Sequence, residues 1–215
     1  VSASRLPPVQ LEVQDHPYIA VPAEAQRTSP ALNWTQDSYT SVQVNVNAQG
    51  NNILGDAANE PSMAIDPTNR LKMVVGWRQF DTINSNFRQA GWAYTQNGGQ
   101  SWTFPGKIEA GHFRSDPVLD ADSNGVFYYD SLTTEGGGYY CKVFRSFNGG
   151  VSWDTGIPAY GGDKEWMVID RSGGVGNGFI YSYWTLAYSV CNGQSARSAI
   201  GGISFWMPTY ISQFR

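Results

Sequence analysis

The chain has 215 residues and a formal net charge of −4, with only 15% charged residues but 24 glycines and 8 tryptophans. This length allows one domain, or two small ones, with a buried core. The mild negative charge argues against a nucleic-acid surface, which needs a basic stripe. No polybasic cluster and no apolar run of roughly 20 residues is present, so we expect no membrane partner either.

The N-terminal residues 1–40 are predicted to form an extended arm, because five of the eleven prolines fall within residues 1–30. Residues 41–215 are predicted to form the folded part. At its start, Ser41–Val46 alternates polar and apolar side chains, which is typical of a strand. We expect it to be an extra outer strand.

Two short apolar segments that end in aspartate, Pro61–Asp66 and Pro117–Asp122, resemble each other, and Glu165–Asp170 is a looser third copy. A longer aromatic segment follows each copy, at residues 71–80, 125–132 and 178–188. The copies recur at offsets of 56 and 48 residues. A repeat of about 50 residues with several strands in each unit is the size of a propeller blade.

Two octets mark a second repeat in the same region. Thr95–Trp102 reads TQNGGQSW, and Ser146–Trp153, 51 residues further along, reads SFNGGVSW. Each octet follows a strand-like stretch, so each is predicted to be a hairpin turn between two strands.

Together the repeats predict an all-β chain made of β-propeller blades, each of four antiparallel strands. The chain contains about two and a half to three such blades, at residues 59–110, 115–160 and 163–206. The third strand of the last unit is predicted at Ile200–Trp206, and no octet follows it.

The octets resemble the Asp-box, or BNR repeat, Ser/Thr-x-Asp-x-Gly-x-Thr/Ser-Trp, of sialidases and related propellers. Asparagine replaces the usual aspartate, but its side-chain oxygen also accepts hydrogen bonds from the hairpin backbone. The glycines allow positive φ in the turn. We interpret the boxes as structural hairpin clasps rather than ligand sites; their key residues are Asn97, Gly99, Trp102, Asn148, Gly150 and Trp153.

The resemblance implies a sialidase-like glycoside hydrolase, or a fragment of one, acting on glycans. Such enzymes hold a substrate carboxylate with arginines, whose rigid fork suits it, and use an aspartate as general acid. Asp81 lies in a loop that resembles the acid's location, whereas Asn59-Glu60-Pro61 stands where the family has Arg-Ile-Pro. The catalytic candidates are Asp81, Glu60 and Asp116, and the substrate-binding candidates are Arg78, Arg88, Arg114, Asp163 and Trp77.

Each of these residues also has a structural alternative, as a turn residue or an ion-pair partner. The alternative function is a non-catalytic propeller module that binds glycans or proteins and closes its ring by self-association, which predicts a homo-oligomer. No cofactor is expected, and no metal, because two distant cysteines and two histidines make no zinc set. Cys141 and Cys191 are either a disulfide or two thiols, and we expect an extracellular or periplasmic location.

Overall fold

The computed structural model of the protein describes residues 14–22, 25–135, 137–199 and 201–209. Within these ranges the chain forms fifteen β-strands and no α-helix, which confirms the predicted all-β class. The described part of the chain therefore has no helix that is long and apolar enough to cross a membrane.

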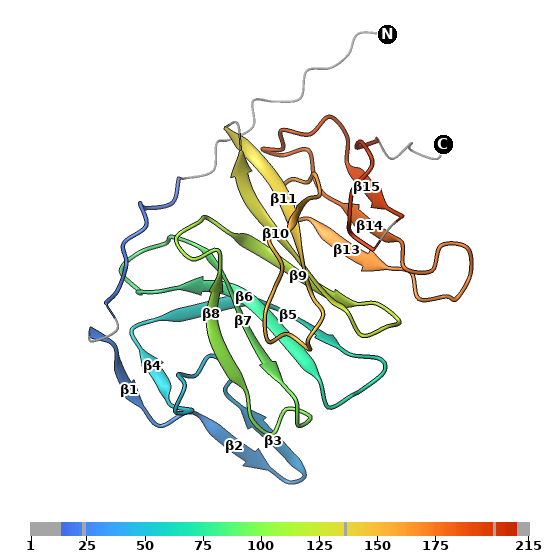
Figure 1. The fold of residues 1–215 in the computed structure, drawn as a ribbon. Helices are drawn as coiled ribbons and strands as arrows, with labels where there is room; N and C mark the ends of the chain where they lie inside the picture. The colour runs from blue at the N-terminus through green and yellow to red at the C-terminus, as the bar shows by residue number, and fades with distance from the viewer. Residues whose placement is uncertain (1–13, 23–24, 136, 200, 210–215) are drawn as a thin grey trace.

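Three antiparallel sheets follow one another along the chain (Figure 1). The first sheet contains β5 (Ala57–Ile65), β6 (Met73–Phe80), β7 (Gln89–Thr95) and β8 (Thr103–Ile108). The second contains β9 (Ser115–Ala121), β10 (Phe127–Glu135), β11 (Gly138–Ser146) and β12 (Ile157–Pro158). The third contains β13 (Trp166–Ile169), β14 (Ile180–Tyr183) and β15 (Ser195–Ser198).

In each sheet the strands pair in sequence order, so each sheet is a simple meander. The first strands of the three sheets lie next to one another, since β9 contacts both β5 and β13. We call β5, β9 and β13 the inner strands. This arrangement is compatible with a propeller-like architecture, but the described residues do not form a closed ring.

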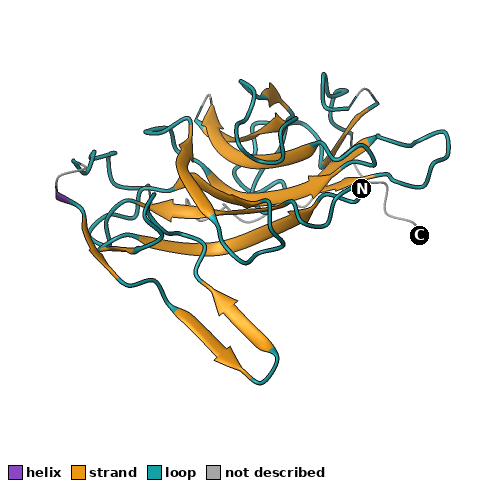
Figure 2. Ribbon diagram, turned by 60° about the horizontal axis from the view of Figure 1, so that its bottom comes forward, coloured by secondary structure: helices purple, strands orange, loops and turns teal. Residues whose placement is uncertain are grey.

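Four short strands precede the first sheet. β1 (Arg27–Ser29) pairs with β4 (Asn52–Leu54), and β2 (Asn33–Gln36) pairs with β3 (Tyr39–Val42). Figure 2 shows the β2–β3 hairpin projecting away from the sheets. The segment predicted as an arm, residues 1–40, thus contains β1, β2 and the start of β3, while residues 1–13 lie outside the described part. The predicted strand at Ser41–Val46 is strand only over its first two residues, inside β3.

The second sheet is buried on both faces, which explains its nearly continuous run of apolar and aromatic residues. Phe127 and Tyr129 of β10 join an apolar cluster with Val74 of the first sheet. Tyr128, which points the other way, joins a second cluster with Met167 of the third sheet. Fully burying one such side chain contributes about 1.5–3 kcal/mol. These two apolar layers hold the three sheets together.

The third sheet differs from the prediction. Its third strand is β15, Ser195–Ser198, rather than Ile200–Trp206. Gly201 and Gly202 adopt positive φ values of 50° and 70°, which turns the chain where a strand was expected. The segment after this turn runs back beside β15, where Trp206 N donates to Arg197 O (2.8 Å).

The two octets form the same hydrogen bonds. Asn97 Oδ1 accepts from Ser101 N at 3.1 Å, and Asn148 Oδ1 accepts from Ser152 N at 3.0 Å. Each asparagine also donates from Nδ2 to the same serine's hydroxyl at 2.8 Å. In both turns the two glycines have φ between 72° and 86°, as tight turns of this kind require.

The second octet also contacts the first sheet. Trp92 Nε1 donates to Gly150 O at 2.9 Å, and a Cβ on Gly150 would meet Val74 at 2.4 Å. The Trp153 ring packs edge-on against Tyr129, with 5.6 Å between ring centroids. The second turn therefore acts as packing between the first and second sheets.

Candidate functional site at the inner strands

The three inner strands share an unusual backbone feature, which lies within the first half of β5 and β9 and two residues before β13. Glu60, Asp116 and Lys164 have φ values of 50°, 45° and 53°. Positive φ is uncommon outside glycine, and residues held in such sparsely populated regions cluster at functional sites. In β5 and β9 the residue begins a β-bulge and precedes a proline, where the register shifts. The same local strain therefore recurs once in each sheet.

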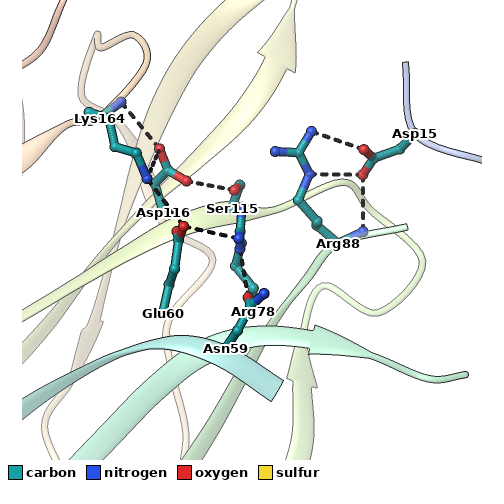
Figure 3. Close-up of polar contacts among 8 residues, drawn as sticks. All are labelled: Asp15, Asn59, Glu60, Arg78, Arg88, Ser115, Asp116 and Lys164. Carbon is teal, nitrogen blue, oxygen red and sulfur yellow. Dashed lines mark hydrogen bonds and ion pairs between the residues drawn. The ribbon is translucent and has the colours of Figure 1, made fainter. Parts of the chain in front are cut away.

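The side chains of these three residues meet (Figure 3). Lys164 Nζ lies 3.3 Å from Glu60 Oε1 and 3.9 Å from Asp116 Oδ2. The backbone N–H of Lys164 also donates to Asp116 Oδ2 at 3.2 Å. One lysine thus links carboxylates from two neighbouring sheets.

Arg78 completes this group from β6. Its Nη2 lies 2.9 Å from Glu60 Oε1, and its Nε donates to Asn59 Oδ1 at 2.8 Å. We call Glu60, Arg78, Asp116 and Lys164 the inner-strand charge cluster. Its Lys164 side chain is 61% exposed, whereas that of Asp116 is 7% exposed. The cluster is therefore open to solvent on its lysine side and closed at its base.

Arg88 binds elsewhere. Its Nη2 lies 2.9 Å from Asp15 Oδ1, and its Nε and backbone N–H donate to Asp15 Oδ2 at 3.0 and 3.1 Å. The guanidinium also stacks over the Phe113 ring, 4.7 Å from its centroid. Figure 3 shows Arg88 turned toward Asp15, so this arginine fixes the N-terminal segment against the first sheet.

Arg114 is almost fully buried and forms an ion pair with Glu109, whose other carboxylate oxygen binds Lys142. Its guanidinium lies over the Phe144 ring, 5.0 Å from the centroid. Burial acts to raise the pKa of Glu109, but hydrogen bonds from Lys142 and Arg114 outweigh it, so the pKa is lowered. Nη2 of this arginine is thus paired with a carboxylate of its own chain, while its Nε and Nη1 are buried without a hydrogen-bond partner among the described residues.

Asp81 belongs to a separate polar group on the first sheet. Its carboxylate lies 3.0 Å from Lys107 Nζ and accepts from Gln89 Nε2 at 2.9 Å. Gln79 Nε2 donates to the nearby Asp56 at 3.1 Å. Burial raises the pKa of Asp56 and the charge of Asp81 raises it further, against the opposing hydrogen bond from Gln79.

The two remaining predicted residues are Trp77 and Asp163, and both lie outside the inner-strand charge cluster. The Trp77 side chain is 2% exposed, donates from Nε1 to Gln79 Oε1 at 2.6 Å and packs on Phe104. Asp163 is half-buried, and its carbonyl accepts from Thr185 N at 3.0 Å. Of the eight predicted residues, the structure brings together Glu60, Arg78 and Asp116, joined by Lys164.

The fold assembles a second group, which the sequence analysis did not identify as a site, between the second and third sheets. One potential ligand atom from each of Asp130, Cys141 and Glu165 lies within 4.8 Å of the other two, and all three residues are buried. None of the four carboxylate oxygens has a hydrogen-bond partner of normal distance and angle among the described residues. The only sequence signal was a lone polar residue inside an aromatic strand, Asp130 in FYYDSL and Cys141 in GYYCKVF.

Burial raises the pKa of both carboxyl groups. For Asp130, a backbone hydrogen bond at Ser131 and the charge of Arg114 oppose this rise. For Glu165, the charges of Asp130 and Asp116 add to it. Burial also raises the pKa of the Cys141 thiol, and the charges of Glu165 and Asp130 raise it further. All three groups therefore favour their neutral, protonated forms when no positive charge lies beside them.

A cleft of about 540 Å³ lies away from both groups, beside the β2–β3 hairpin. It has no titratable side chain in its lining, which consists of Pro30, Ala31, Leu32, Ser41, Val42, Gln43 and Asn52. It is therefore not a candidate for acid–base chemistry.

Comparison with known proteins identifies no family: no protein-family model and no curated protein matches the chain. Among solved structures, the chain is similar to a protein of unknown function from Dyadobacter fermentans DSM 18053. The two are 15% identical with a TM-score of 0.45, and the match covers 71% of this chain and 57% of that one. The chain thus spans less than two thirds of that structure's length.

Proposed function

We propose that this chain is a propeller-type module whose three sheets are successive blades, and that it binds glycans at the inner-strand charge cluster without cleaving them. The observation that carries this proposal is the pairing of the three candidate arginines. Arg78, Arg88 and Arg114 each bind a carboxylate of the chain itself. They are therefore not arranged as a free triad for one substrate carboxylate.

The accessible part of the cluster has the right chemistry for a sugar. The Lys164 ammonium offers hydrogen-bond donors, and Glu60, whose side chain is 36% exposed, offers acceptors. Sugar hydroxyl groups both donate and accept, so a mixed-charge site can hold them. A sugar carboxylate would pair with Lys164 in place of Glu60.

An exposed aromatic pair lies next to the cluster in the third sheet, since Trp166 follows Lys164 by only two residues. Trp166 and Tyr183 are directly paired across β13 and β14, and their side chains are 65% and 41% exposed. Flat aromatic faces with a polar edge suit ligands that are apolar on one side and wet on the other. We infer that a sugar ring stacks on this pair.

Glycan-array screening followed by calorimetry with the best ligand tests the proposal. Lys164→Ala and Trp166→Ala should each weaken binding at least tenfold. Two matched controls should bind normally: Arg70→Ala, an exposed cation in the turn after β5, and Tyr39→Ala, an exposed aromatic residue on the β2–β3 hairpin. Absence of any glycan ligand, or unchanged affinity in both test variants, would refute it.

Sialidase-like hydrolysis is the second candidate, and one observation favours it. Glycosidases use two carboxyl groups, one of them with a raised pKa, and burial, together with the charge of Asp81, raises the pKa of Asp56. A fluorogenic sialoside and a panel of other aryl glycosides test this reading. Turnover that Asp81→Asn abolishes, and that the exposed-loop control Asp37→Asn retains, would replace the binding proposal with an enzymatic one.

Self-association is also proposed, because apolar side chains are exposed on the two outer sheets. Met63 and Ile65 are exposed on the first sheet, and Val168 on the third. Such surfaces favour contact with another chain. Light scattering tests this directly, and a stable monomer at high concentration would argue against it. An extracellular or periplasmic location remains a prediction.

A further inference from the structure

We propose that Asp130, Cys141 and Glu165 together bind one divalent transition-metal cation of the Zn²⁺ type, which joins the second sheet to the third. This inference is independent of the glycan proposal. It depends on the geometry, burial and unmet hydrogen bonding of these three side chains.

Pairing within the second sheet determines where two of the three ligands point. Asp130 lies opposite Val143 on β11, and Leu132 lies opposite Cys141. Because side chains alternate along a strand, Asp130 and Cys141 share the face that carries Tyr128, which packs against the third sheet. Glu165 enters from the third sheet, immediately before β13, so the three ligands come from two sheets.

Their burial demands a partner. Asp130 is 0% exposed, Cys141 1% and Glu165 2%, yet none of the four carboxylate oxygens accepts a hydrogen bond of normal geometry from a described residue. The Ser131 backbone N–H beside Asp130 and the Cys141 thiol beside Glu165 are only weak partners. A buried polar atom left without a partner costs about 1–3 kcal/mol, and more when it is charged. One water molecule donates only two hydrogen bonds and carries no charge. A divalent cation would instead neutralise both carboxylates at once.

Nearby positive charge does not remove this need. Arg114 is close enough to lower the pKa of Asp130, but the ion pair that it forms is with Glu109. A protonated carboxyl group is the competing solution, since burial raises the pKa of both acids. A bound cation reverses this preference, because it stabilises the carboxylates and deprotonates a coordinating thiol.

The donor set selects the type of metal. Ca²⁺ takes six to eight oxygen ligands and Mg²⁺ retains several waters, so a buried thiol suits neither. Zn²⁺ accepts cysteine sulfur and carboxylate oxygen at about 2.0–2.3 Å in a tetrahedral site. Donors at those bond lengths lie about 3.3–3.8 Å apart, so the 4.8 Å limit of this group requires only a small contraction. The fourth position would be open to a water molecule.

The experiment uses the full chain, stripped of metal by a chelator and dialysed. Zn²⁺ is titrated by calorimetry, Co²⁺ is followed by its optical spectrum, and the Tm is measured with and without Zn²⁺. We expect one equivalent of Zn²⁺, a sulfur-to-Co²⁺ charge-transfer band and a higher Tm with metal. Cys141→Ser should lose the band and weaken Zn²⁺ binding at least about tenfold, as loss of a ligand costs no less than loss of its supporting contacts.

Cys191→Ser is the matched control, because Cys191 is the other free thiol of the described chain and accepts a hydrogen bond from Gly161 N at 3.3 Å. It should keep both the band and the affinity. No saturable Zn²⁺ binding, or a Co²⁺ spectrum without a sulfur band, would overturn the proposal. The spectrum of the unmutated chain decides the question even if Cys141→Ser fails to fold.

Discussion

Lys164 Nζ lies 3.3 Å from Glu60 Oε1, although 104 residues separate the two in the sequence. Both residues have positive φ, Glu60 within the first half of β5 and Lys164 two residues before β13, and their side chains bridge the first and third sheets. The strained backbone of each inner strand therefore directs its side chain toward the place where the three sheets meet.

The lysine and the buried aspartate of this cluster should differ in their effect on stability. Lys164→Met should change the free energy of unfolding by less than about 1 kcal/mol, because exposed ion pairs contribute little. Asp116→Asn should cost about 1–3 kcal/mol, since Asp116 accepts hydrogen bonds from Lys164 N and Ser115 Oγ and an amide has only one acceptor oxygen. Urea denaturation of both variants measures the two changes in the free energy of unfolding. Equal losses of stability would contradict the burial of Asp116 and the exposure of Lys164.

Gly76 should not tolerate a side chain, because the first and second sheets approach closely there. A Cβ would lie 2.5 Å from a ring carbon of Tyr129 and 2.6 Å from Leu119 Cδ1. Overpacking of this kind typically costs about 1–3 kcal/mol, so Gly76→Ala should lower the Tm clearly. Gly174→Ala is the control, since its Cβ would have only Ser172 Oγ nearby at 3.4 Å. Identical melting of the two variants would mean that the sheets pack differently.

The turn octets should accept aspartate in place of asparagine. In Asn148→Asp the oxygen that accepts from Ser152 N remains, and the Ser146 and Ser152 hydroxyl groups can donate to the carboxylate. We expect stability to stay within about 0.5 kcal/mol, as for ordinary surface changes. Asn148→Ala removes these hydrogen bonds and should cost about 1–2 kcal/mol. Thermal melts of these variants, with the exposed-loop variant Asn84→Ala as a control, check both values. If Asn148→Ala left the stability unchanged, the Asn148 side chain would not stabilise the turn.

Acid should remove the contribution of Asp154 to the free energy of unfolding. Burial acts to raise the pKa of Asp154, but bonds from Arg145 and from the Gly156 backbone outweigh it, so the pKa is lowered. The unfolded chain then binds the proton more readily, and the stabilisation is present above the ordinary pKa of about 3.9 and lost as the pH falls below it. The stability advantage over Asp154→Asn should therefore shrink between about pH 5 and pH 2. Denaturation curves of both proteins across this range test the prediction. A stability difference that does not change with pH would contradict the lowered pKa of Asp154.

Regular elements of the first two sheets were predictable because their signals are local. Alternating apolar residues and Asn-Gly-Gly turns predict strands near Pro61–Asp66 and Pro117–Asp122, and the structure has β5 and β9 there. The same local rules failed after Ser198, where the aromatic residues of 200–206 suggested a strand. Two glycines with positive φ turn the chain back instead, and no periodic pattern reports such a turn.

The candidate site was only partly predictable. Polar residues before the inner strands drew attention to Glu60, to Asp116 and to the segment 163–165, but nothing in the sequence indicated that the Lys164 side chain would reach Glu60 of the first sheet. Arg88 was expected near a ligand, yet it binds Asp15, 73 residues away. Ion pairs between distant residues depend on how the sheets stack, and a side-chain type carries no information about its partner.

The sequence by itself determined the all-β class, the repeating strand order and the turn octets, because hydrogen bonds over two to four residues and side-chain alternation depend on local spacing alone. Only the tertiary structure decided which charges meet at the inner strands and which acids lie buried with Cys141. Stacking of the second sheet against the third places Glu165 beside Asp130, 35 positions earlier in the chain. That encounter is a property of the packed sheets, since each strand alone leaves its carboxylate in water.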